Sequence, residues 1–255
     1  MLAEPELFKL HFVKPNESIR KEELVMRSEM SVGRTVGILL LLQMACALIL
    51  PFVLMRALNG GYPDFLEAAA ASGGQIRAGM ALAFFGAALT LLLGIKMFPV
   101  LKQYSRGAAL WFLGICAISC ALDAVHNGTV LSMLSVSERF TNSGGGDAAV
   151  YQAWGAAAAS TRRSAHLVQL VAIGAWMMTF YISLWRFRLV PRPLSVIGII
   201  GVASQFTGVT AMMFLGYPQL GFLAMPLAPI HAATAIWLIV KGFLSPVTNS
   251  IRALG

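Results

Sequence analysis

The sequence predicts an all-α, polytopic membrane protein, a bundle of six transmembrane helices, and three observations predict this class. The 255-residue chain is 58% hydrophobic and 12% charged, whereas an ordinary soluble domain is about 25% charged. Its mean hydropathy is +0.74. It also contains six apolar stretches long enough to cross a bilayer, which takes about 20 helical residues. A soluble protein of this length would need more polar surface than 19 basic and 11 acidic residues provide.

Charged residues mark the limits of the six predicted spans. The interior of each apolar stretch lacks Lys, Arg and Glu, and basic residues stand at many of the ends. The spans cover roughly residues 33–55, 78–98, 108–131, 164–185, 194–216 and 221–243. The chain therefore divides into an amphipathic N-terminal segment (1–32), a six-helix transmembrane domain (33–244) and a C-terminal tail (245–255).

Lys and Arg are distributed unequally between the two sides of the predicted bundle. With the N-terminus inside, 14 basic residues fall on the inner side and 5 on the outer side. Because basic loops stay in the cytoplasm during insertion, both termini are predicted to be cytoplasmic, in a bacterial inner (plasma) membrane. The same bias, with contacts to anionic headgroups, accounts for the net charge of +8. No basic stripe with interleaved aromatic residues indicates a nucleic-acid partner.

The loops alternate in length, as this orientation requires. The short basic connections, 99–107 and 186–193, are predicted inside, and the long ones, 56–77 and 132–163, outside. Gly and Ser predict a mobile segment over about 136–146. Asp147 is a candidate N-cap for a helix over 148–159.

Several short segments, in this order and spacing, resemble those of a known family. They are Gly33–Leu40 with its Arg-x-x-Gly entry, Gln75–Gly79, the start of the fourth span at His166 with Gly174-Ala175-Trp176, Val190–Gly198, and Ile236–Phe243. Together they resemble the bacterial membrane family "domain of unknown function 4386" over about residues 31–244. The resemblance implies a six-helix inner-membrane protein without an established activity. Members often carry an acid in the last helix where this chain has His231, so the resemblance assigns no role to that position.

Ionisable and amide side chains inside the predicted spans are the candidate functional residues, because polar groups in a bilayer are costly. Asp123 is the only acid within a span. His126, His166 and His231 are also within spans, and Gln205 lies near the centre of 194–216. All five fall in the central or outer half of the membrane, so they could line one polar cavity.

Polar residues of the span 108–131 share one face of the expected helix. Cys116, Ser119, Cys120, Asp123 and Asn127 follow one another at spacings of 3, 1, 3 and 4. At helical periodicity these spacings form a stripe, which must face protein or water.

Prolines and glycines predict the shape of the last two spans. Pro226 and Pro229 should kink the last span just before His231 and free backbone carbonyls there. Gly198, Gly201 and Gly208 form a small-residue face on the fifth span, which predicts close helix packing.

Asp123 and His231 are predicted to contact each other. Their depths in the membrane differ by about 5 Å at 1.5 Å per residue. An unpaired polar group at this depth is costly, so we expect the two side chains to face the bundle interior and to meet directly, through water or through Gln205.

Several interpretations of these residues remain open. The favoured one is a non-enzymatic component for small-molecule or lipid binding, transport or membrane-complex assembly, with a polar cavity and no cofactor; its partners would be the bilayer, such a ligand and a membrane protein. In a purely structural interpretation, the polar residues clamp the helices together. A zinc site of His126, His166, His231 and Asp123 would make the protein a metal-dependent intramembrane enzyme with a hydrolase-like site. His126 and His166 could instead ligate a b-type haem. No P-loop, dinucleotide fingerprint or nucleophile elbow is present, so ATP hydrolysis, hydride transfer and serine-hydrolase chemistry are unsupported.

Overall fold

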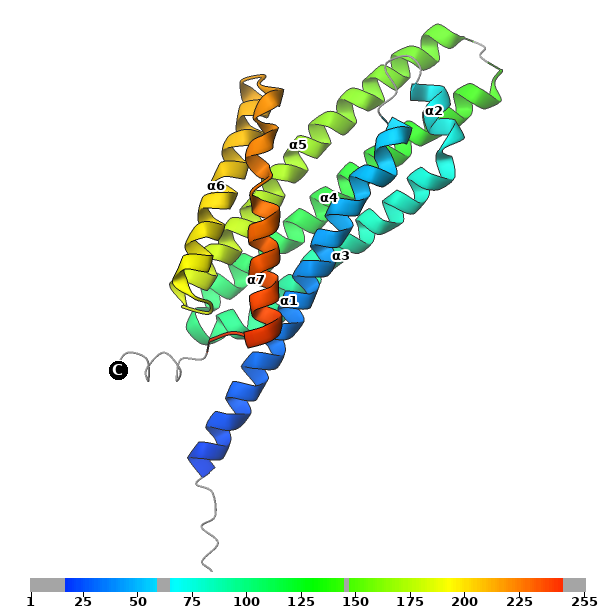
Figure 1. Cartoon of the computed structure of the whole chain (residues 1–255). Coiled ribbons are helices and arrows are strands. Elements are labelled where there is room, and N and C mark those ends of the chain that lie inside the picture. The colour runs from blue at the N-terminus through cyan, green and yellow to red at the C-terminus, as the bar shows by residue number, and fades with distance from the viewer. Residues whose placement is uncertain (1–16, 59–64, 145–146, 245–255) are drawn as a thin grey trace, which may run out of the picture.

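The computed structural model describes residues 17–58, 65–144 and 147–244, and this part of the chain is helical without any strand. The all-α prediction is confirmed. The helices, coloured from blue to red in Figure 1, are α1 (Glu17–Leu58), α2 (Phe65–Ala71), α3 (Gly73–Tyr104), α4 (Arg106–Asn142), α5 (Ala148–Arg186), α6 (Arg192–Phe214), the 3-10 helix η1 (Pro218–Ala224) and α7 (Leu227–Lys241).

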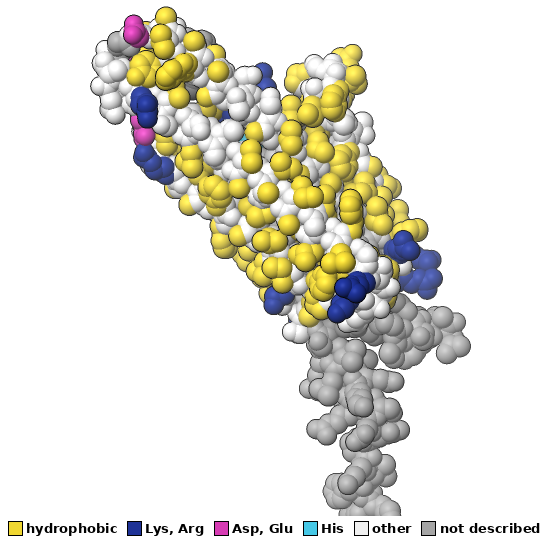
Figure 2. Space-filling view, turned by 180° about the vertical axis from the view of Figure 1, so that it is seen from behind, with side chains coloured by type: hydrophobic (Ala, Val, Ile, Leu, Met, Phe, Trp, Pro, Cys, Tyr) yellow, Lys and Arg dark blue, Asp and Glu magenta, His cyan; other side chains and the backbone are white. Residues whose placement is uncertain are grey.

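Six helical segments of the described chain are long and apolar enough to cross a membrane, as the sequence predicts. They belong to α1, α3, α4, α5, α6 and the η1–α7 pair. Figure 2 shows hydrophobic side chains over the middle of one face, with Lys and Arg gathered toward the two ends. This distribution suits a protein surrounded by lipid, because apolar side chains need no other cover there.

The spanning helices pack in a closed ring. In order of contact it runs α1, α3, α4, α5, α6, α7 and back to α1. The main core inside the ring is built from large side chains that are fully buried, among them Phe112, Trp176, Phe180 and Tyr181. At the turn between α3 and α4 a single residue, Ser105, connects the two helices, and its hydroxyl caps α4 by accepting from the amide of Ala108 at 3.2 Å.

The fourth and fifth helices are longer than predicted. α4 has 37 residues and α5 has 39, so each is about 55–60 Å long, against an apolar bilayer core of about 30 Å. Most of the predicted outer loop 132–163 is therefore helical, and the paired ends of α4 and α5 project beyond α6 (Figure 1). The helix over 148–159 is confirmed. The prediction of a mobile loop is wrong for residues 136–142, because these residues continue α4. The hydropathy of the sequence indicates where the lipid-facing part of a helix ends, and the helix itself can continue further.

The predicted division between residues 32 and 33 and the predicted end of the first span at residue 55 both lie inside α1. α1 runs without a break from Glu17 through the predicted division at residue 32. Residues 1–16 and 245–255 lie outside the described chain, so the proposed roles of both terminal segments stay predictions. The predicted loop 56–77 contains α2, which packs against α4, and the start of α3.

The last span is interrupted, as Pro226 and Pro229 predict. The 3-10 helix η1 ends at Ala224, and α7 begins at Leu227. The hydroxyl of Ser204 in α6 donates to the carbonyl of Leu223 at 2.8 Å. A side chain thus satisfies a carbonyl near the break.

The predicted close packing of α6 is confirmed at its glycines. A Cβ placed on Gly198 would overlap the Tyr181 ring of α5, and one on Gly208 would lie 2.6 Å from the carbonyl of Leu220. Only glycine fits these contacts without a shift of the neighbouring residue.

Candidate functional site

The polar stripe predicted on α4 faces the protein. Cys116, Ser119, Asp123 and Asn127 are all buried, and Cys120 is partly buried. His126, on the same inner side, is 7% exposed.

Asp123 pairs with a residue of α5. The amide nitrogen of Gln169 donates to Asp123 Oδ1 at 2.6 Å. The amide oxygen of Gln169 lies 3.1 Å from His166 Nδ1. Because this oxygen can only accept, His166 Nδ1 is the donor. Gln169 therefore connects the buried carboxyl group with an exposed histidine.

His126 and His166 lie against each other. Their ring centroids are 5.0 Å apart and the rings are inclined by 39°. Neither ring nitrogen of the buried His126 makes a hydrogen bond to a residue that the structure describes. His166 is exposed, with its Nδ1 bound to Gln169 and its Nε2 left for another partner.

Arg162 lies on the same face of α5 as His166, one helical turn closer to the N-terminal end of the helix. Its Nε is buried and has no hydrogen-bond partner among the described residues. Among the described residues there is one salt bridge, between Arg77 and Glu138 at 2.6 Å. No described acid therefore forms a salt bridge with Arg162.

These residues line a cavity of about 350 Å³ between α1, α4 and α5, which we call the histidine cavity. Apolar side chains of α1 and α5 form much of its wall. A neighbouring hollow of about 90 Å³ shares part of this wall and reaches Asp123. The residues of the histidine cavity are Ala47, Leu50, Pro51, Leu54, His126, Arg162, His166, Gln169, Leu170 and Ile173.

His231 lies in a separate group of side chains, and Gln205 bonds to the backbone of α5. The hydroxyl of Tyr181 is 3.1 Å from His231 Nδ1, and Gln205 donates to the carbonyl of Leu170 at 3.1 Å. Trp176 packs edge-on against the His231 ring. His231 Nε2, Gln205 Oε1 and Trp176 Nε1 each have no hydrogen-bond partner among the described side chains and backbone.

The predicted contact between Asp123 and His231, directly or through Gln205, is wrong. Both side chains are buried, at 8% and 2% exposure, as expected. However, each of them has a partner on α5 instead. Asp123 accepts from Gln169, and His231 lies against the hydroxyl of Tyr181. Similar depth in a bilayer does not decide which helices are neighbours.

The four candidate metal ligands divide between these two groups. Within the described residues, no group of three or more His, Cys, Asp or Glu side chains could hold a metal ion. Zinc and haem binding stay predictions.

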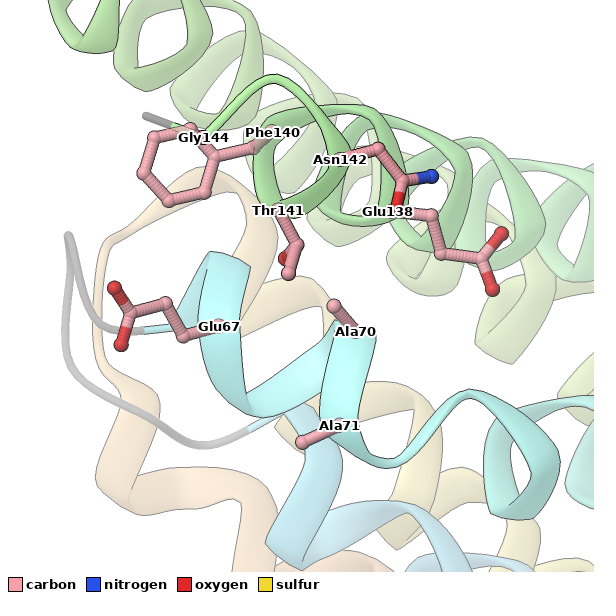
Figure 3. Close-up of a pocket in the computed structure, with 8 residues that line it drawn as sticks. All are labelled: Glu67, Ala70, Ala71, Glu138, Phe140, Thr141, Asn142 and Gly144. Carbon is pink, nitrogen blue, oxygen red and sulfur yellow. The ribbon is translucent and has the colours of Figure 1, made fainter. Parts of the chain in front are cut away.

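A larger hollow, of about 670 Å³, lies between α2 and the end of α4. Glu67 and Glu138 border it but point away from each other (Figure 3). Glu138 is also paired with Arg77. The hollow therefore lacks the converging polar groups that are typical of a ligand site.

Sequence reasoning missed Arg162 and Gln169. Both lie on one face of α5 with His166, at positions 162, 166 and 169, which is the helical spacing of four and three residues. This pattern was available in the sequence. Gln169 lies with His166 in the predicted span 164–185, so their spacing is readable from the sequence. Arg162 lies in the predicted loop 132–163, and in a loop it has no fixed relation to the histidine.

Comparison with known proteins identifies one relationship. The model of a family described as domain of unknown function (DUF4386) matches residues 35–242. No curated protein and no solved structure matches the chain.

Proposed function

The chain belongs to the DUF4386 family, and we propose that it binds an amphiphilic small molecule or a lipid in the histidine cavity. The protein is then a non-enzymatic binding or transport component of the membrane. This function develops the polar cavity that the sequence predicts, with its position moved to α1, α4 and α5.

The observation that carries the proposal is the state of His126. Its side chain is buried, yet neither ring nitrogen has a hydrogen-bond partner in the described ranges 17–58, 65–144 and 147–244. An unsatisfied buried polar group costs about 1–3 kcal/mol. A ligand in the cavity would remove this cost by hydrogen bonding to the ring.

The cavity's size and lining support the same function. Ligand sites commonly have volumes of about 300–1,000 Å³ and apolar walls with a few polar groups. The histidine cavity has about 350 Å³. Leu50, Leu54 and Ile173 supply apolar surface, and Arg162 and His166 supply polar groups.

The orientation of the proposed site follows from the charge bias. We place the protein in a bacterial inner membrane with both termini in the cytoplasm, because 14 of 19 basic residues then lie inside. The cavity lies in the outer half, so its ligand would come from the outer leaflet or the periplasm.

The test is photolabelling of the protein in phosphatidylcholine nanodiscs with a diazirine-bearing hexadecanol. Mass spectrometry should locate the label on α1 or α5 at the cavity wall. Leu50→Trp fills the cavity and should reduce labelling there at least tenfold. The control is Ile49→Trp, because Ile49 is 49% exposed and lies outside the cavity lining. Equal site labelling in the two variants, or label only on outward-facing residues, would contradict the proposal.

A further inference from the structure

We infer that the ligand of the histidine cavity carries an acidic head group, a carboxylate or phosphate, which binds to Arg162. This inference rests on the proposed function, since it names the class of ligand for the same cavity. The two histidines would bind the same head group or the atoms next to it, and the apolar wall would take the chain.

Arg162 has no counterion among the residues whose side chains are described. Side chains are described for residues 30–54, 66–144 and 147–244, and their acids are Glu67, Asp123, Glu138 and Asp147. Glu138 pairs with an arginine of α3, and Asp123 accepts from an amide. The other two are exposed and make no salt bridge with Arg162. Within the described part of the chain, the buried Nε of Arg162 therefore has neither a hydrogen bond nor a paired charge.

The arrangement along α5 keeps an anion away from the buried acid. Arg162 is seven residues from Gln169, the partner of Asp123. Seven residues separate their positions by about 10 Å along the helix axis. His166 and His126 lie between these levels, packed at 5.0 Å. An anion at Arg162 would therefore meet histidines before it approaches the carboxyl group.

Arginine is well suited to such a head group. Its planar guanidinium can donate two parallel hydrogen bonds to a carboxylate or phosphate. The neutral form of His126 offers one donor and one acceptor. The Nδ1 of His166 donates to Gln169, so the Nε2 of neutral His166 is an acceptor and can bind the hydroxyl of a protonated head group. Arg162 and His126 thus supply the donors for an oxyanion in one cavity.

Arg163 shows that an arginine at this depth does not have to be partly buried or to line the cavity, as Arg162 does. The two residues are adjacent on α5, but Arg163 is exposed and does not line the cavity. An arginine that only contacted surrounding headgroups would resemble Arg163. Arg163 is therefore the matched control for charge and depth.

The experiment measures displacement of dansyl-undecanoic acid from the whole protein in phosphatidylcholine nanodiscs, with empty nanodiscs subtracted. The competitors are dodecanoate, dodecyl phosphate, dodecanol and inorganic phosphate. We expect the parent protein to bind the two anionic amphiphiles at least tenfold more tightly than dodecanol. Arg162→Gln should abolish this preference, Arg162→Lys should restore part of it, and Arg163→Gln should leave it unchanged.

The outcomes separate this inference from the proposed function. If dodecanol binds as well as dodecanoate and binding is lost in Leu50→Trp, the cavity binds amphiphiles and the acidic head group is refuted. If Arg163→Gln weakens binding as much as Arg162→Gln, the effect is surface charge and the inference fails. If inorganic phosphate displaces the probe at the same concentration as dodecyl phosphate, the site binds a free anion. The inference that the ligand is an amphiphile would then be refuted. If no amphiphile binds, both proposals fail.

Discussion

Gln169 uses both ends of its amide, and this makes Asp123 a part of the cavity's framework. The nitrogen donates to Asp123 and the oxygen faces His166. A loss of either partner leaves a polar atom of Gln169 unsatisfied beside the cavity. The position of His166 therefore depends on a residue of another helix.

The first prediction at the residue scale concerns Asp123. Asp123→Asn should be milder than Asp123→Leu, because asparagine keeps an oxygen that can accept from Gln169 Nε2. Leucine leaves this donor unpaired, at a cost of about 1–3 kcal/mol. Thermal unfolding of the purified protein in detergent measures the difference. Equal losses of stability would show that the hydrogen bond does not matter.

At the scale of elements, α5 and α6 can approach closely because α6 has a glycine, Gly198, at the contact. The Tyr181 ring occupies the space where a Cβ of Gly198 would lie. The hydroxyl of the same tyrosine lies 3.1 Å from His231 Nδ1 in α7. A shift of this ring would therefore disturb two helix contacts at once.

The prediction at this scale is that Gly198→Ala destabilises the protein, by about 1–3 kcal/mol, as is typical of an overpacked core. Gly114→Ala and Gly128→Ala are controls in α4, because nothing lies within 4 Å of a Cβ at either position. They should be neutral or stabilising, since alanine favours a helix by up to about 1 kcal/mol over glycine. Thermal unfolding in detergent compares the three variants. A Gly198→Ala protein as stable as the controls would refute the tight contact.

At the scale of the whole molecule, the two ends of the bundle differ. One end carries the α3–α4 turn at Ser105 and the C-terminal end of α7; the other carries the projecting ends of α4 and α5 (Figure 1). The charge bias predicts that the first end is cytoplasmic.

Cysteine labelling in intact cells tests this orientation. Ser143→Cys and Gln103→Cys place thiols at exposed positions near opposite ends. An impermeant maleimide should label the first variant and not the second, which should react only after the cells are opened. The parent protein is the background control, because Cys46 and Cys116 are buried and Cys120 partly so. The reverse pattern would invert the topology and place the cavity in the inner half.

The candidate site was predictable in part. The sequence predicts that all five polar candidates could line one cavity. His126 and His166 do so, and Asp123 borders the neighbouring hollow. His231 lies elsewhere, with Tyr181. Gln169 and Arg162 could have been added from their spacing to His166. Tyr181 could not, since a tyrosine in an apolar helix carries no signal of the histidine it will meet.

The sequence by itself determined the class of the protein, its six spans, the buried stripe of α4 and the break before His231. These features depend on local properties, namely the length of apolar stretches, helical periodicity and proline. Only the tertiary structure decided that Asp123 and His231 have different partners, and that Arg162 lines a cavity. It also decided that α4 and α5 continue past the predicted spans. These depend on which helices are neighbours, and hydropathy is nearly the same on every helix in lipid, so it holds little information about neighbours.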